Sequence, residues 1–364
     1  MKRATLRDIA QALGVTVATV SRALKDYPDI SIATKQLVLA AAERLHYAPH
    51  PMAVKLRQKS YRVVGVVVPD IVHPFFSDVI SGIIEVAEGQ GYHVLLSQSN
   101  ESFEKEIRVT QMLHATGMDG LLVCLSNETA TVDHLRALQD YDLPVVLFDK
   151  ISADLDASSV VTDDFQGAYD AVTHLLAQGC TRVAHLKGPP NPENTRKRFA
   201  GYQAALAAHG LPFRPEYVVE CHDVSHAEGL AFTRQLLALP EPPDGIFAVS
   251  DSVAIGALTA LREEGRRVPA DVAVVGFSDW AVCQLVEPQV SSVAQPGYEI
   301  GRQATELLLR EIQQLRDDQP LEHSRTVLGA TLRVRGSSQR LVTDEGSRAV
   351  LRSAAPQLPT AASA

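Results

Sequence analysis

The sequence has few residues of the kinds that form cross-links, metal centres or membrane spans. Only four of its 364 residues are cysteines, and no two of them form a C-x-x-C pair. Neither a disulfide framework nor a zinc site is therefore expected. No run of eighteen apolar residues occurs, and Arg7, Asp8 and Gln11 interrupt the N-terminal stretch before the core of a signal peptide could form. We expect a soluble, globular protein of the cytoplasm with no membrane partner.

The sequence also lacks the short motifs of common enzymes. No G-x-G-x-x-G follows the first expected strand, and G-x-x-x-x-G-K-[ST], H-E-x-x-H and G-x-S-x-G are absent. His114, His134 and His174 lie singly on helical patterns, where solvated or hydrogen-bonded histidines are more common than catalytic ones. We therefore expect no enzyme activity, no catalytic residue, no cofactor and no metal ion.

Charge is distributed unevenly along the chain. Residues 1–60 hold ten lysines and arginines and four acidic residues, a net charge of +6, while the whole chain carries −9 and the remainder therefore −15. The asymmetry indicates a basic segment for a polyanion, joined to an acidic body with another role. A solvated basic face without a partner is the alternative. The length and the 46% hydrophobic content predict two or three domains.

Three helices are predicted in the first fifty residues. Thr5 and Asp8 have the spacing of a capping box, Gly14 ends that helix, and Thr16 and Ser31 can cap the next two. Apolar residues recur at helical spacing and are expected to form a small core: Leu6, Ile9, Ala10, Leu13, Val17, Val20, Leu24, Leu37, Val38, Ala41, Ala42 and Leu45. The first two helices and their short turn have the pattern of a helix-turn-helix.

In a helix-turn-helix the second helix lies in the major groove of DNA and its first residues reach the bases. The second predicted helix offers suitable side chains: Thr16, Val17, Ala18, Thr19, Ser21 and Arg22. Arg22 can bind the O6/N7 edge of guanine, and Val17 and Ala18 are small enough to contact a thymine methyl group. The alternative is that a helix of this composition only packs in a core.

A short helical turn is expected after Pro51, over residues 52–57. It is too short to be stable alone in water. It would fold only against a partner, for which DNA and a second copy of the chain are the candidates.

The stretch TLRDIAQALGVTVATVSRALKDYPDISIATKQLVLAAAERLHYAPHPMAVKLR closely resembles the DNA-binding head and hinge of LacI/GalR bacterial transcription regulators. The resemblance implies that positions 17, 18 and 22 read the major groove. It also implies that Leu56 enters the minor groove as a wedge that kinks the duplex, with Arg57 beside it. The implied DNA-binding residues are Thr5, Thr16, Val17, Ala18, Thr19, Ser21, Arg22, Ala53, Leu56 and Arg57.

Beyond residue 61 the pattern changes to short apolar strands that alternate with amphipathic helices. Nine strands are predicted, at 63–69, 92–99, 119–126, 144–149, 159–164, 182–188, 217–221, 245–250 and 272–278. Unbroken apolar strands between helices predict a parallel sheet covered on both faces. Nine of them predict an α/β body of two doubly wound halves, joined near 150–162 and again near 288–296.

The body resembles the effector domain of the same family, which has the two-lobed fold of periplasmic sugar-binding proteins. The matching stretches include PDIVHPFFSDVISGIIEVAEGQGY, VTDDFQGAYDAVTHLLAQGCTRVAHLKGP and FAVSDSVAIGALTALREEG. The expected organisation is a helix-turn-helix head, a hinge, an effector-binding and dimerisation domain of two lobes, and a disordered tail. The head covers residues 1–49, the hinge 50–61, the effector domain 62–336 and the tail 337–364. Within the effector domain, the first lobe is expected at about 62–160 and 292–320, and the second at about 161–291 and 321–336. The tail has no leucine heptads, which favours a homodimer over a tetramer.

A sugar site needs carboxylates or amides and an arginine for the hydroxyls, and an aromatic plate for the apolar ring face. Family motifs point to eight candidates for effector binding: His73, Phe75, Asp149, Arg198, Asp251, Asp279, Trp280 and Gln295. Arg198 and Asp251 form the favoured pair, as clamp and hydroxyl acceptor. Asp251 could instead cap the helix that follows it. Ser250 and Ser278 stand where the family often has Asn and Asp, so the ligand of a better-known relative cannot be copied.

The sequence predicts a dimeric transcription regulator, most simply a repressor of carbohydrate catabolism or transport genes. Its partners would be a palindromic double-stranded DNA operator and a small effector, expected to be a sugar or sugar derivative, and the protein would associate with the nucleoid. One alternative is an activator or a co-repressor-dependent regulator with a purine or nucleoside effector. A sugar-binding protein or an enzyme on the same scaffold is disfavoured by the head and by the missing motifs.

Overall fold

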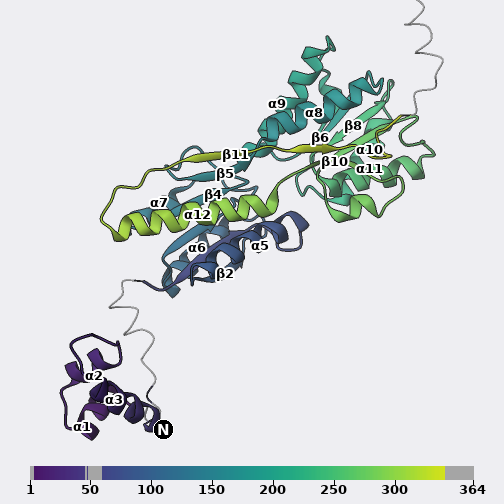
Figure 1. Cartoon of the computed structure of the whole chain (residues 1–364). Coiled ribbons are helices and arrows are strands. Elements are labelled where there is room, and N and C mark those ends of the chain that lie inside the picture. Colours follow the sequence, from purple (N-terminus) through teal and green to yellow (C-terminus); the bar gives the residue numbers. More distant parts are fainter. Residues whose placement is uncertain (1–3, 46, 48–59, 341–364) are drawn as a thin grey trace, which may run out of the picture. The chain divides into compact units, whose positions relative to one another are not determined.

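The computed structural model describes residues 4–45, 47 and 60–340. The chain divides into two compact units, Met1–Tyr61 and Arg62–Ala364 (Figure 1). Among the described residues, no helix is long and apolar enough to cross a membrane.

The first unit contains three helices, α1 (Leu6–Leu13), α2 (Val17–Ala23) and α3 (Ile32–Arg44). Each begins at the predicted cap, and Thr5 and Asp8 form the predicted capping box. Gly14 ends α1 with φ of 65°, a left-handed conformation that glycine adopts without strain. The core contains Ile9, Ala10, Val20, Ala23, Val38, Ala41 and Ala42.

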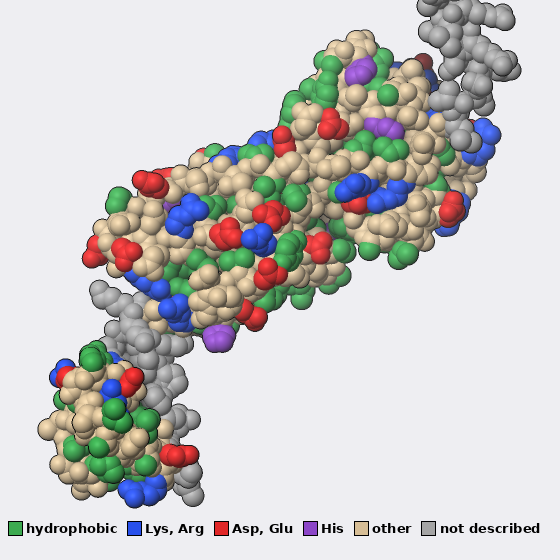
Figure 2. All heavy atoms as spheres, viewed as in Figure 1, with side chains coloured by type: hydrophobic (Ala, Val, Ile, Leu, Met, Phe, Trp, Pro, Cys, Tyr) green, Lys and Arg blue, Asp and Glu red, His purple; other side chains and the backbone are tan. Residues whose placement is uncertain are grey.

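Two residues expected in this small core lie outside it. Leu37 is 62% exposed, because the buried face of α3 follows Val38, Ala41 and Ala42, one residue out of register with it. Val17 is 41% exposed and so belongs to the open face of α2. Apolar side chains are therefore visible on the surface of this unit (Figure 2).

Two six-stranded sheets form the second unit, which confirms the predicted doubly wound α/β architecture. The first sheet has the order β11 (Arg325–Leu328), β5 (Ser159–Thr162), β4 (Val145–Phe148), β3 (Gly120–Val123), β1 (Val63–Val68), β2 (His93–Gln98). The second has the order β12 (Thr331–Arg333), β10 (Ser291–Ala294), β9 (Ala273–Ser278), β8 (Gly245–Ala248), β6 (Val183–Lys187), β7 (Val218–Glu220). All neighbours are parallel except β10 and β12.

Helices cover both sheets, as the apolar strands require (Figure 1). On the first sheet lie α5 (Pro74–Gly89), α6 (Phe103–Thr116), α7 (Asp133–Gln139) and α12 (Gly297–Arg316). On the second lie α8 (Asp164–Ala177), α9 (Glu193–Ala208), α10 (His226–Leu237) and α11 (Asp251–Glu263), with the short 3₁₀ turns η1 (Pro215–Tyr217) and η2 (Ala281–Gln284).

The nine predicted strands are present, and three further strands were not predicted: β10, β11 and β12. Serines and exposed polar residues interrupt these short segments, so they lack an apolar run. Because of them the chain crosses between the sheets three times, after β5, after β10 and between β11 and β12.

The second and third crossings shift the expected lobe boundaries. Residues 292–320 were assigned to the first lobe, and α12 does pack there, but β10 pairs with β9 in the second sheet. Residues 321–336 were assigned to the second lobe, and β12 does lie there, but β11 pairs with β5 in the first sheet. Strands β10, β11 and β12 thus alternate between the sheets, and β11 and β12 each form an edge of their sheet.

Helices α5 and α12 pack closely through glycine. A Cβ at Gly301 would lie 2.0 Å from the carbonyl oxygen of Val79, whereas a Cβ at Gly89, the last residue of α5, would meet nothing within 4 Å. We expect Gly301→Ala to reduce the free energy of unfolding by about 1–3 kcal/mol, the usual cost of overpacking. Gly89→Ala should leave it unchanged or slightly higher. Urea denaturation of the full chain measures both, and equal stability of the two variants would contradict the close packing.

Candidate nucleic-acid interface and ligand cavity

The exposed face of α2 carries the predicted base-reading residues. Val17, Ala18 and Arg22 are exposed on it. The Thr16 hydroxyl accepts the Thr19 backbone N–H at 3.1 Å, which fixes the start of the helix. Ser21 is half-buried, and Thr5 bonds Asp8 at the start of α1. Ala53, Leu56 and Arg57 lie outside the described residues.

Arg22 is held in place on this face. Its guanidinium forms an ion pair with Asp29 at 2.6 Å and lies 5.5 Å from the ring centroid of Tyr27. Both partners of the ion pair are about half exposed, so the pair adds little stability. A nucleic-acid base or phosphate that binds Arg22 would compete with the Asp29 carboxylate.

A cavity of about 520 Å³ lies in the second unit. It is lined by residues at or just beyond the carboxyl ends of strands from both sheets, where doubly wound folds bind ligands. Six of the eight predicted effector residues line it: His73, Phe75, Asp149, Arg198, Trp280 and Gln295.

Arg198 is the buried cation of this cavity. Its Nε donates to Asp164 Oδ1 at 2.8 Å and its Nη1 to the Val249 carbonyl at 2.8 Å, and the guanidinium lies 3.7 Å from the Phe277 ring centroid. Burial raises the pKa of Asp164 to about 6, although Arg198 acts to lower it. Burial likewise raises the pKa of Asp149, again against the attraction of Arg198. Arg198 and Asp149 are the donor and acceptor available to a ligand here.

Asp251 and Asp279 do not line the cavity; they support its wall. Asp251, fully buried at the start of α11, accepts hydrogen bonds from the Ser292 hydroxyl at 2.5 Å and the Trp280 backbone N–H at 2.7 Å. Asp279 forms an ion pair with Arg335 at 2.6 Å. The favoured pair of Arg198 and Asp251 is therefore not brought together at the cavity surface. The residue that caps α11 is Ser250, not Asp251.

Lys150 is a cavity residue that the prediction missed. Its ammonium donates to Glu101 Oε1 and, at 2.7 Å, to Asn127 Oδ1. Further polar residues were also missed: Asp70, Gln98, Asn100, Asn194, Thr195, Asp223, Ser250 and Ser278. Several directly follow a predicted strand, as in SQSN and FDK, so the rule that ligands bind at strand ends could have found them.

An aromatic pair joins the two sides of the cavity. The rings of His73, which follows β1, and Trp280, which follows β9, meet edge to face with centroids 4.9 Å apart. Burial lowers the pKa of His73, so its ring is largely uncharged at neutral pH. The Trp280 indole N–H has no hydrogen-bond partner among the described residues. The two lobes are therefore in contact at this edge of the cavity through a pair of uncharged rings.

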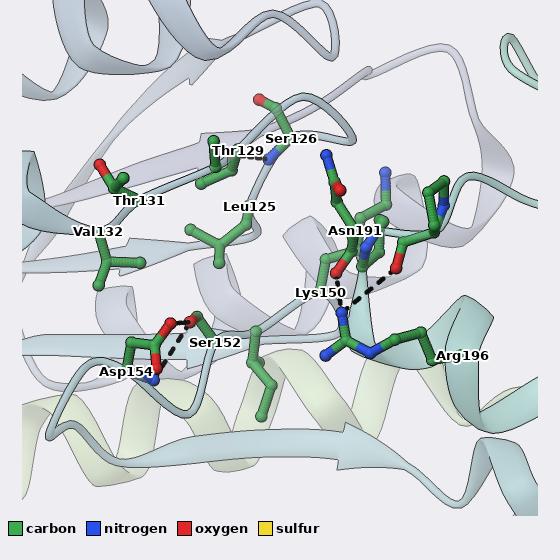
Figure 3. Close-up of a pocket in the computed structure, with 14 residues that line it drawn as sticks. Leu125, Ser126, Thr129, Thr131, Val132, Lys150, Ser152, Asp154, Asn191 and Arg196 are labelled. Carbon is green, nitrogen blue, oxygen red and sulfur yellow. Dashed lines mark hydrogen bonds between the residues drawn. The ribbon is translucent and has the colours of Figure 1, made fainter.

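A second cavity of about 300 Å³ adjoins the first (Figure 3). Lys150 lines both, and Asn191 Nδ2 bonds the Asn127 carbonyl at 3.2 Å, linking loops of the two lobes. Arg196 lines this second cavity and donates to the carbonyls of Pro190 and Asn191. Within residues 4–45, 47 and 60–340, no group of His, Cys, Asp and Glu side chains is arranged to hold a metal ion.

Comparison with known proteins gives two family matches. Residues 61–331 match the model of periplasmic binding proteins and the sugar binding domain of the LacI family, and residues 5–50 match that of bacterial regulatory proteins of the lacI family. The chain is 34% identical over 340 residues to the HTH-type transcriptional repressor CytR of Escherichia coli (strain K12), covering 93% of this chain and 97% of that protein. It is 34% identical over 307 residues to catabolite control protein A of Priestia megaterium, covering 84% and 92%.

Two solved structures extend the likeness over nearly the whole chain. The lac repressor dimer bound to operator and the anti-inducer ONPF has a TM-score of 0.78 and 26% identity, covering 93% of this chain and all of that one. The complex of the transcriptional regulator CelR with cellobiose has a TM-score of 0.70 and 29% identity, covering 92% and 100%.

The buried Asp251 gives a pH-dependent prediction. Burial raises its pKa from 3.8 to about 7, so between these pH values the folded chain binds the proton more readily than the unfolded chain. This carboxyl therefore makes the protein less stable as the pH rises from about 4 to about 7, by at most about 1.4 kcal/mol per unit.

The variant Asp251→Asn should lack that component of the pH dependence, whatever its stability at one pH. Urea denaturation across this range compares it with the wild type and with Asp140→Asn, an exposed control. Parallel pH profiles for wild type and Asp251→Asn would contradict the burial of an ionisable group there.

Proposed function

Since the chain belongs to the LacI family of bacterial regulatory proteins, we propose that it is a dimeric repressor that binds a palindromic operator and responds to a small ligand. The observation that carries the proposal is the open face of α2, where Val17, Ala18 and Arg22 are presented by a capped helix-turn-helix. A helix of this kind enters the major groove and reads base edges from its N-terminal end.

The proposed contacts divide into two kinds. Val17 and Ala18 contact apolar base edges, and Arg22 binds guanine. Four side-chain hydroxyls contact phosphate groups of the DNA backbone: those of Thr5, Thr16, Thr19 and Ser21. Leu56 acts as the minor-groove wedge, with Ala53 and Arg57 beside it. Two copies related by twofold symmetry present two such helices, which is why the operator should be palindromic.

Dimerisation needs exposed apolar surface on the second unit. Large apolar side chains are exposed on this unit, among them Leu285 at 83% and Met112 at 53%. The lac repressor, which is similar to this chain, is a dimer in its structure with operator. We therefore propose that the functional form is a homodimer that works on DNA in the cytoplasm, in association with the nucleoid.

The proposed effector is a sugar or sugar derivative, with a purine or nucleoside as the second possibility. The cavity combines a donor, Arg198, and an acceptor, Asp149, with the rings of Phe75 and Trp280. These groups suit a ligand with hydroxyl groups and an apolar ring face. A ligand that contacts both lobes favours the closed arrangement of the lobes around the cavity. Besides the His73–Trp280 ring contact, the lobes are joined by the Asn191–Asn127 hydrogen bond and the Arg325–Glu193 ion pair at 2.6 Å.

The experiment that tests the proposal is a footprint of the full chain on the DNA upstream of its own and neighbouring genes. We expect protection of a palindromic site with two half-sites about one helical turn apart, and transcription that rises when the gene is deleted. Binding that shows no preference among sequences would refute the proposal.

Arg22→Ala should weaken operator binding by about 1–3 kcal/mol and relax specificity at one base pair. The fold should tolerate this change, because the ion pair with Asp29 is exposed. Asp29→Ala is the matched control, since it breaks the same ion pair but leaves Arg22 free, and it should bind the operator at least as well as the wild type. Gel-shift titrations on operators changed one base pair at a time measure both variants. An equal loss on every sequence would make Arg22 a phosphate contact instead.

Removing Arg198 should abolish the ligand response without weakening DNA binding in the DNA-competent state. Because Asp164 would then be buried without its partner, the change is best made as Arg198→Ala with Asp164→Asn. Arg310→Ala, an exposed arginine on α12, is the control for lost positive charge. A double variant whose operator affinity still responds to ligand as the wild type does would move the effector site elsewhere.

A further inference from the structure

We propose that the cavity takes an uncharged, hydroxyl-bearing ring compound and rejects the phosphate ester of the same compound. The inference rests on the proposed function, because it concerns the ligand that this regulator senses. The observation behind it is that the cations lining the cavity already have carboxylate partners.

Both cations of the cavity have carboxylate partners of their own. Lys150 donates to Glu101 and to Asn127. Arg198 lies against Asp164 at 2.8 Å and also donates to the Val249 carbonyl. A phosphate would have to displace a carboxylate from one of these pairs. The Arg198–Asp164 pair is buried, and the Lys150 side chain is only 11% exposed although its partner Glu101 is 36% exposed, so removing either carboxylate partner is unfavourable.

The remaining charges of the lining are negative. Besides Glu101, which pairs with Lys150, three aspartates line the cavity: Asp70, Asp149 and Asp223. Burial lowers the pKa of His73 and so disfavours the positively charged form of its ring. A dianionic phosphate would therefore enter a region of like charge, which disfavours it over a neutral group of the same size.

The same lining suits a neutral ligand. Amide side chains that can both donate and accept hydrogen bonds stand around the cavity: Gln98, Asn100, Asn127, Asn194 and Gln295. Arg198 retains N–H groups that can donate to a hydroxyl oxygen, and Asp149 can accept a hydrogen bond from a hydroxyl group. Phe75, Phe76 and Trp280 provide apolar surface for a ring.

One nearby arginine could bind an anion, but it lines the other cavity. Arg196 is exposed, and within the described part of the chain its guanidinium donates to two backbone carbonyls of its own loop (Figure 3). The Lys150 side chain and the Asn191–Asn127 hydrogen bond lie where the two cavities meet. A phosphate held by Arg196 is therefore the competing outcome, and the test includes Arg196→Gln.

The test is calorimetry on the full chain with matched pairs: ribose and ribose 5-phosphate, glucose and glucose 6-phosphate, uridine and uridine 5′-monophosphate, with inorganic phosphate alone. We expect an uncharged member to bind, and its phosphate ester to bind at least about tenfold more weakly, or about 1.4 kcal/mol. Inorganic phosphate should not compete. Phosphate esters that bind as tightly as their parents, or binding by esters alone, would overturn the inference. If that binding is lost in Arg196→Gln, the second cavity is the anion site.

A second variant tests the cause of the selectivity. Glu101→Gln frees the Lys150 ammonium, so the phosphate esters and inorganic phosphate should gain at least about tenfold in affinity. Glu322→Gln removes one exposed acid outside the cavity and should give no gain. Unchanged phosphate affinity in Glu101→Gln would overturn the charge argument. The operator footprint of the same preparations is measured separately. Loss of specific DNA binding would refute the proposed function, whereas the calorimetry alone decides the ligand selectivity.

Discussion

The three chain crossings between the two sheets are the constraint on which the rest of the second unit depends. They follow β5, β10 and β11, and hydrogen bonds join them: Gln295 Nε2 to Thr162 Oγ1 at 3.1 Å, and the Asp163 N–H to the Leu328 carbonyl at 2.8 Å. The carboxyl ends of the parallel strands in both sheets line one cavity beside these crossings. A ligand in that cavity therefore touches both lobes at once. It can change their relative position only by bending the segments that join them, as in hinge closure of two-lobed proteins.

Charged and polar residues of the cavity lie next to these crossings. Asp164 is the first residue of α8, directly after the first crossing, and it holds Arg198 of α9. Gln295, at the second crossing, accepts from the Ser278 hydroxyl at 2.8 Å. A ligand hydroxyl bound by Arg198 therefore acts next to the hinge. Separating Arg198 from Asp164 would leave a buried charge unpaired, which is unfavourable, so a shift of one is expected to shift the other. Ligand binding at Arg198 can therefore change the relative position of the lobes.

Much of the fold could be predicted from the sequence, because its local signals are strong. The caps at Thr5, Thr16 and Ser31 and the nine apolar strands are visible in the residues themselves, and the structure has them. Strands β10, β11 and β12 were missed because their register comes from pairing with distant strands and not from an apolar run. Leu37 was misplaced because it is one residue from the buried stripe of α3.

The site was harder to predict than the fold. Six candidates do line the cavity, yet the sequence could not tell which aspartate faces it, because Asp149 and Asp251 both follow apolar strands. Only the structure shows that the Ser292 hydroxyl and the Trp280 backbone N–H donate hydrogen bonds to the Asp251 carboxylate. Likewise, Lys150 and Glu101 are 49 residues apart, and no local pattern joins them. Pairing across the fold decides which charged groups remain available to a ligand.

In the proposed mechanism, one ligand-driven movement of the lobes controls binding to DNA. The most direct measurement is the affinity of the full-length dimer for its operator with and without saturating effector, together with its affinity for the effector with and without operator. We expect both affinities to change by the same factor, about 5- to 150-fold, because coupling between two sites is reciprocal. An operator affinity that is unchanged at saturating effector would contradict it.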